Sequence, residues 1–265
     1  MNEQPVPPAL PAQGPLREPS REPGREPGRE PAPSHPAKTW WRRHRNVLLG
    51  MSAILLMRSA VANWHPIPSA SMQPTLKEGD VVLVDRTAYG IKWPLTDHFA
   101  LQGQPPARGD IITFSHPQQG HRLIKRVVAV AGDVVAMRGG RVWLNGEPVS
   151  QALQPSGWPE AKGPQVDQPS LAASAPQRWT ETLGAHAHDM QWLPGVPALR
   201  DFPEVTVPSG HVLVLGDNRD NSADSRYFGF VPLNLIEGRA HHLLVSVDPD
   251  GHWMPRWERF GMRLQ

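Results

Sequence analysis

Short segments of alternating or β-branched apolar residues recur along the chain after Pro68, and they restrict the possible fold more than any other feature. Turn-forming residues separate these segments, which cover residues 80–91, 109–116, 121–137, 140–149, 204–217 and 239–248. Such alternation places every second side chain on the same face of a strand. No long stretch with a helical period follows residue 64. The sequence therefore predicts a mainly β fold built from antiparallel β-sheets.

One region interrupts this β pattern. Residues 150–203 are rich in Pro, Ala and Gln and show no clear periodicity. A long structureless segment inside a compact domain is uncommon. We therefore expect one β-rich domain formed by residues 65–149 and 204–265, with residues 150–203 as an insertion or a large flap.

The N-terminal residues 1–39 do not have the composition of a folded domain. They contain the repeat REPSREPGREPGREP, in which Arg and Glu balance each other. Proline at every fourth position prevents a helix, and the apolar content is too low for a core. The sequence predicts a disordered tail.

Residues 40–64 combine a basic cluster with an apolar run from Val47 to Met57. This layout fits a cleavable signal peptide that ends at Ala60–Ala62. It also fits an uncleaved transmembrane anchor, whose short run is extended by a snorkelling Arg58 and flanked by tryptophans. In both cases the positive flank keeps the N-terminus in the cytoplasm and sends the following chain to the other side.

Composition excludes two classes of site. The chain has no cysteine, so disulfide frameworks and thiolate metal sites are excluded. The formal net charge is +2, so a basic field for nucleic acid is not expected.

A Lys-Arg pair lies in the middle of an apolar strand, in the sequence HRLIKRVVAV. Strand alternation puts Lys125 on one face and Arg126 on the other, so one of the two cations must lie against a largely apolar surface. An edge strand with both cations in water would explain the pair equally well. A buried Lys125 would instead have a lowered pKa and could accept a proton; lowering that pKa to about 8 costs about 3 kcal/mol.

The densest polar stretch of the folded region is GDNRDNSADSRYFGF, residues 216–230. These residue types favour solvated turns. The spacing lacks the glycine and the terminal Glu of a calcium loop. A packed network is the third possibility, in which Asp224 and Arg226 form an ion pair and Ser222 orients a neighbour. The HAHD sequence, His186–Asp189, is a weaker candidate for a metal site because no third cluster of ligands accompanies it.

Two serines, Ser69 and Ser71, follow the apolar segment within PIPSASMQPTL. This stretch is either a proline-stiffened linker or the site of a nucleophile. A nucleophilic serine needs a base, and Lys125 is a candidate.

Four motifs, PSASMQPTL, RGDIITF, KRVVAVAGD and GDNRDNSADSRYFGFVP, occur in this order. In the order and style of these motifs the chain resembles the bacterial type I signal peptidases. The resemblance extends from the apolar segment to the C-terminus and leaves out only the insertion, residues 150–203. The resemblance implies a serine protease of the Ser-Lys dyad type on antiparallel β-sheets, held by an uncleaved anchor over residues 40–64. It implies no metal or organic cofactor.

The resemblance also assigns roles to individual residues. Ser71 matches the nucleophile and Lys125 the general base. Ser69 matches the hydroxyl that helps to bind the oxyanion, and Ser222 the serine that orients the lysine amine. Asp224 and Arg226 match a supporting ion pair. The residues that match the lining of shallow substrate pockets are Ile67, Met72, Leu76 and Ile124.

Two positions depart from the family pattern. The family usually has Gly-x-Pro-Gly-Asp after the lysine strand, where this chain has AVAGD, so a different turn is expected at Ala131. His65 and Pro66 stand where an aromatic and a polar residue are frequent, which changes the outer pocket.

The function implied by the resemblance is removal of signal peptides from exported preproteins at Ala-x-Ala sites. The implied location is the bacterial inner membrane, crossed once, with the catalytic domain periplasmic. Expected partners are signal peptides, membrane lipid and the protein-export translocon, and not nucleic acid. A specialised maturation peptidase of the conjugation type and an anchored β-domain that binds exported peptides without cutting them are the alternatives.

Overall fold

A computed structural model describes the chain except for residues 1–39, 41–42, 52–61, 93–98, 156–174 and 265. The predicted tail and much of the predicted anchor lie outside the described residues. Residues 43–51 are helical. Among the described residues, no helix has both the length and the apolar character needed to span a bilayer. The chain divides into two compact units, residues 1–50 and residues 51–265, and the β domain belongs to the second.

The largest sheet has the strand order β1-β2-β16-β5-β6-β14-β15, with β17 paired to β16. Every pairing in it is antiparallel, which confirms the predicted class. Its strands are β1 (Ala62–Pro66), β2 (Asp80–Asp85), β5 (Ile111–Ser115), β6 (Arg122–Val130), β14 (His211–Leu215), β15 (Val231–Pro232), β16 (Ile236–Asp248) and β17 (Met254–Pro255).

Smaller sheets complete the fold. One has the order β13-β7-β8-β9, one pairs β3 with β4, and one has the order β10-β11-β12. These strands are β3 (Gly90–Lys92), β4 (Phe99–Gln102), β7 (Val134–Arg138), β8 (Arg141–Leu144), β9 (Glu147–Pro148), β10 (Ser150–Leu153), β11 (Gln177–Leu183), β12 (His186–Trp192) and β13 (Phe202–Thr206). The short helices are η1 (Ala70–Met72), α2 (Ser225–Phe228), η2 (Leu233–Leu235) and η3 (Trp257–Arg259).

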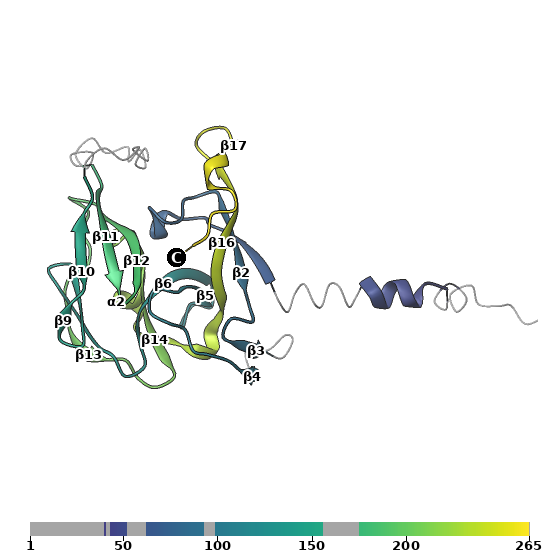
Figure 1. The fold of residues 1–265 in the computed structure, drawn as a ribbon, viewed down its shortest axis with the longest axis horizontal. Coiled ribbons are helices and arrows are strands. Elements are labelled where there is room, and N and C mark those ends of the chain that lie inside the picture. The colour runs from purple at the N-terminus through teal and green to yellow at the C-terminus, as the bar shows by residue number, and fades with distance from the viewer. Residues whose placement is uncertain (1–39, 41–42, 52–61, 93–98, 156–174, 265) are drawn as a thin grey trace, which may run out of the picture. The chain divides into compact units, whose positions relative to one another are not determined.

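Strand β6 lies in the middle of the domain and is buried on both faces. Six consecutive residues, 124–129, are buried. Ile124 belongs to an apolar cluster with residues of β2 and η1, whereas Val127 and Val128 belong to two other clusters. In Figure 1, β5 and β6 lie between β2 and β16 on one side and β11 and β12 on the other. Apolar packing on both faces therefore fixes the strand that carries Lys125.

Two sequence expectations need correction. Residues 62–64, which the sequence places in the anchor, pair in β1 with β2. The described part of the insertion is not irregular, because β10, β11 and β12 form an antiparallel sheet. Its alternation was hidden because several of its buried positions are polar, among them Glu181, His188 and Gln191.

Candidate active site

Ser71 lies in the single turn η1, which follows an extended segment. Ser69 precedes the turn with φ −141° and ψ 154°, and the amide of Gln73 donates to the carbonyl of Ala70 at 3.0 Å. The side-chain oxygens of Ser69 and Ser71 are 3.3 Å apart. Ser71 is half-buried and Ser69 is exposed, so a substrate can reach both hydroxyls.

Lys125 projects from β6 to Ser71. Its Nζ is 2.7 Å from Ser71 Oγ and donates to the Ile124 carbonyl at 2.8 Å. Strand alternation required at least one cation of the Lys-Arg pair to lie against an apolar surface, and the structure buries both; the alternative of an edge strand with both cations in water is wrong. Lys125 is 2% exposed and Arg126 1%, because β6 is covered on both faces.

Burial determines the charge state of Lys125. Loss of hydration lowers the pKa of Lys125 to about 8, although the carboxylates of Asp224 and Asp217 act in the opposite direction. At neutral pH about a tenth of the amines are therefore neutral. A neutral amine in contact with a serine hydroxyl can accept its proton.

Asp224 and Arg226 form the predicted ion pair, and both side chains are fully buried. Arg226 Nε donates to Asp224 Oδ1 and Nη2 to Oδ2, each at 2.8 Å. Asp224 also accepts the amide of Gly216 at 3.0 Å and caps α2. One carboxylate therefore joins the two ends of the segment Gly216–Arg226, which we call the catalytic loop.

Ser222 does not make the predicted hydrogen bond to Lys125. In the part of the chain that the structure describes, its buried hydroxyl has no hydrogen-bond partner. The side chain packs on Gly216: a Cβ added to this glycine would lie 2.2 Å from Ser222 Oγ and 2.5 Å from the Ser71 carbonyl oxygen. Ser222 therefore lies beside the backbone of Ser71.

Sequence reasoning missed a second buried ion pair, between Asp217 and Arg126. Arg126 Nε and Nη2 donate to the two carboxylate oxygens of Asp217 at 2.9 and 2.8 Å. Asp217 also accepts the hydroxyl of Thr75 at 2.5 Å. Burial opposes the ionised form of Asp217, but the guanidinium of Arg126 holds the pKa of the carboxyl below its usual value. The adjacency of Lys125 and Arg126 was the available signal, since a buried arginine needs a carboxylate partner.

The predicted pocket residues are brought together. Ile67, Met72, Leu76 and Ile124 belong to one apolar cluster, together with residues of β2 and β16. Ile124 is the most exposed of the four, at 9%. Met72 and Ile124 are the sequence neighbours of Ser71 and Lys125, so this cluster, which we call the apolar wall, packs next to the two residues.

Among the strands that the structure describes, two edges next to Ser71 and Lys125 are unpaired. β1 is the first strand of the large sheet and pairs on one side with β2. β14 pairs with β6 only from Arg126 onward, so among the described strands residues 122–125 pair on one side alone, with β5. Side-chain contacts link the two segments, because His65 Nδ1 lies 3.3 Å from Arg122 Nη1 and Lys125 reaches Ser71.

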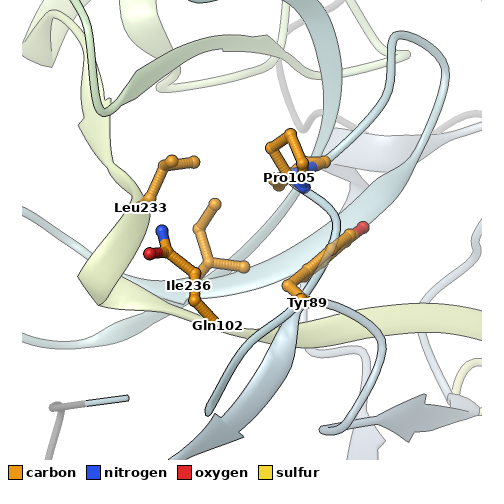
Figure 2. Close-up of a pocket in the computed structure, with 7 residues that line it drawn as sticks. Tyr89, Gln102, Pro105, Leu233 and Ile236 are labelled. Carbon is orange, nitrogen blue, oxygen red and sulfur yellow. The ribbon is translucent and has the colours of Figure 1, made fainter.

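A small pocket lies elsewhere, with a volume of about 120 Å³. Figure 2 shows Tyr89, Pro105, Leu233 and Ile236 around it; Gln102, Gly103 and Pro106 complete its lining. It contains neither Ser71 nor Lys125 and is smaller than typical ligand pockets of about 300 Å³ or more. It is not the candidate site.

The HAHD segment lies in β12 and does not gather metal ligands. His188 is buried, and its Nε2 lies 3.4 Å from Glu181 Oε2. Burial and the charge of Arg126 lower the pKa of His188. No group of three His, Asp or Glu side chains suited to a metal occurs among the described residues.

Comparison with known proteins agrees with this geometry. The family model described as "Signal peptidase, peptidase S26" matches residues 40–245. A signal peptidase I of Pseudomonas fluorescens is 34% identical over 224 residues, which cover 79% of this chain and 74% of the relative. The corresponding enzyme of Pseudomonas aeruginosa is 33% identical over 222 residues, with the same coverage. A probable signal peptidase I-1 of Synechocystis is 33% identical over 227 residues, which cover 81% of this chain and 87% of the relative. The chain is a serine endopeptidase that belongs to the signal peptidase family, peptidase S26.

Proposed function

We propose that the protein removes signal peptides from exported preproteins, with Ser71 as nucleophile and Lys125 as general base. One observation carries the proposal: the 2.7 Å contact between Lys125 Nζ and Ser71 Oγ, made by a lysine that is 2% exposed. The names of the relatives supply the substrate class.

In the first step neutral Lys125 takes the proton of the Ser71 hydroxyl while Oγ attacks the scissile carbonyl carbon. The carbonyl π bond becomes a negatively charged oxygen in a tetrahedral intermediate. Lys125, now an ammonium, gives its proton to the leaving amine nitrogen as the C–N bond breaks. An ester between Ser71 and the signal peptide remains, and the mature protein leaves with a free amino group.

In the second step Lys125 accepts a proton from a water molecule, whose oxygen attacks the ester. When the ester C–O bond breaks, the proton returns to Ser71. Lys125 thus carries one proton at a time and is neutral at the start and at the end of the cycle.

The oxyanion needs donors on the side away from Lys125. We assign this role to the backbone amide of Ser71 and the hydroxyl of Ser69, which lies 3.3 Å from Ser71 Oγ. Loss of one such donor lowers kcat by about 10² to 10³. We propose that the Ser222 hydroxyl accepts a hydrogen bond from the second N–H of the neutral Lys125 amine. This hydroxyl is buried and has no hydrogen-bond partner in the described structure.

The substrate enters as an extended strand between the two open edges, at Ile67–Ser69 and at Arg122–Lys125. Backbone hydrogen bonds then provide much of the affinity, and side-chain pockets provide the selectivity. We assign to the cluster of Ile67, Met72, Leu76 and Ile124 the selection of small residues at the cleavage position and two positions before it, as in Ala-x-Ala; Ile124, at 9%, is the most exposed of the four.

We also propose that the N-terminal segment holds this site at a membrane. We propose an uncleaved anchor over residues 40–61, with the tail in the cytoplasm and the β domain on the periplasmic side of the inner membrane. Signal peptides lie in the same bilayer, so an anchored enzyme meets them without diffusing through bulk water. Membrane lipid and the export translocon are the partners that this arrangement implies.

The test is cleavage of a preprotein with an Ala-x-Ala site by the full chain in detergent or lipid. Wild type should cut at that site, whereas Ser71→Ala and Lys125→Ala should lose turnover, and Ser71→Ala should still bind the preprotein. The control Lys77→Ala removes another lysine with a lowered pKa and should retain activity. Near-normal turnover by Lys125→Ala would show that another residue is the base.

A further inference from the structure

The described part of the insertion makes polar contacts with the catalytic loop that a surface flap would not need. At the backbone, the amide of Gln191 in β12 donates to the Asp217 carbonyl at 2.9 Å, and the amide of Arg219 donates to the Gln191 carbonyl at 3.0 Å. Gln191 and Asn218 form a parallel bridge. The backbone of one residue of the insertion, Gln191, therefore hydrogen-bonds to the catalytic loop through both its amide and its carbonyl.

A buried ion pair reinforces this junction. Glu181 in β11 is completely buried, and Arg219 is 1% exposed. Arg219 Nη1 donates to Glu181 Oε1 at 3.1 Å, and Nη2 donates to Oε2. The third side-chain donor of this guanidinium, Nε, bonds to the Gly216 carbonyl at 3.2 Å. Arg219 therefore connects a carboxylate of the insertion to the start of the catalytic loop.

The same loop residues touch the dyad. The amide of Asn218 donates to the Ser71 carbonyl and its Nδ2 to the Ala70 carbonyl, both at 3.1 Å. Asp217 holds Arg126, the neighbour of Lys125 in β6, through two hydrogen bonds. A displacement of residues 216–219 would therefore move the nucleophile and change the charges that face Lys125.

We propose that Glu181 and Arg219 are positioning residues, through which the insertion fixes the catalytic loop against Ser71 and Lys125. This inference rests on the proposed function for its kinetic consequences. Neither residue touches the substrate or the reacting atoms. The insertion is thus part of the catalytic framework and not a cover for it.

A second, weaker contact joins the same two parts. Arg200, near the end of the insertion, donates from Nε and Nη2 to the carboxylate of Asp220 at 3.1 and 2.7 Å. Its side chain is 41% exposed. The side chain of Asp220 is fully buried but also accepts the amide of Leu193 at 2.8 Å. Arg200→Gln therefore leaves Asp220 with one hydrogen bond and loosens the same junction.

The test compares wild type with Glu181→Gln in the full chain in detergent, with rates normalised to the folded fraction. Glutamine keeps the shape but leaves the charge of Arg219 unpaired. We expect kcat to fall about tenfold or more, because misplacement of about 1 Å is costly to catalysis. KM should change less than about twofold, since the substrate edges are untouched. Glu204→Gln is the matched control, because Glu204 is 61% exposed in its pair with Arg138 and should leave kcat unchanged.

A purely structural role would not move the pH profile. Arg219 stays charged, and its unpaired charge beside Asp217 and Asp224 should lower the pKa of Lys125, so the acid limb of kcat should move to lower pH. Nitrogen NMR of labelled lysine, assigned with Lys125→Arg, should show the same shift independently of turnover. If wild type has no turnover, the proposed function fails and the NMR shift alone decides the present inference.

A folded Glu181→Gln with unchanged kcat, pH limb and NMR titration would overturn the inference. If Glu181→Gln does not fold, Arg200→Gln decides: a lower kcat with a shifted limb supports the junction, and wild-type values refute it.

Discussion

Lys125 gives the sharpest quantitative prediction, because catalysis and stability should respond to it in opposite directions. Replacement by methionine keeps the volume of the side chain and removes the amine. Lys125→Met should lose turnover and should also gain free energy of unfolding relative to wild type at neutral pH, because the buried amine no longer has to be ionised there.

The size of this effect follows from the two pKa values. Burial lowers the pKa of Lys125 from 10.5 to about 8. Between these values the unfolded chain binds more protons, so the free energy of unfolding of wild type rises with pH across this window. Ionisation of Lys125 changes the free energy of unfolding by about −3 kcal/mol at pH 7, about −2 kcal/mol at pH 9 and about −1 kcal/mol at pH 10.

The measurement is urea unfolding of wild type and Lys125→Met in the same detergent at these three pH values. Other groups titrate equally in both proteins, so the difference between the two free energies isolates Lys125. Hydrogen bonds lost with the amine shift this difference by a constant and leave its slope unchanged. Ser71→Ala, which retains the lysine, should follow the wild-type pH dependence. A difference that stays constant from pH 7 to pH 10 would refute the argument that burial lowers the pKa of this amine.

Three further outcomes are expected. The wild-type kcat/KM should rise about tenfold per pH unit at low pH and level off above a midpoint of about 8; a midpoint near 6.5 would point to a histidine base. Gly216→Ala should lower kcat about a hundredfold or more in the preprotein assay, because its Cβ would lie 2.5 Å from the Ser71 carbonyl oxygen; wild-type kcat would mean that the loop yields without moving Ser71. Asp224→Asn should destabilise the fold by about 3 to 5 kcal/mol in urea, because Arg226 would be left buried and unpaired, whereas the exposed Glu204→Gln should change it by less than about 0.5 kcal/mol; equal effects would contradict this role of burial.

The proximity of Lys125 to Ser71 was predictable because it involves residue types that are conspicuous in a sequence. A lysine inside an apolar strand indicated a buried base, and the polar stretch 216–230 indicated a packed network. The contact between Lys125 and Ser71 and the pair between Asp224 and Arg226 agree with both indications.

The remaining features depend on packing that a linear pattern does not contain. Alternation assigns opposite faces of β6 to Lys125 and Arg126, but it does not predict whether other parts of the chain cover both faces, as they do. The strands of the insertion were missed because Glu181 and His188 occupy buried positions where apolar residues are expected. The Ser222 hydroxyl packs on Gly216 and has no hydrogen-bond partner among the described residues, which the sequence did not indicate.

The open edge of β6 has a consequence for how many different substrates one enzyme can serve. An edge strand forms hydrogen bonds with the backbone amides and carbonyls of a bound peptide, whose spacing is the same in every extended peptide. In the proposed binding mode, the side chains of the substrate matter at the few positions that face the apolar wall. Under the proposed function, substrates can therefore differ along the rest of the extended segment, and one protease can serve many of them.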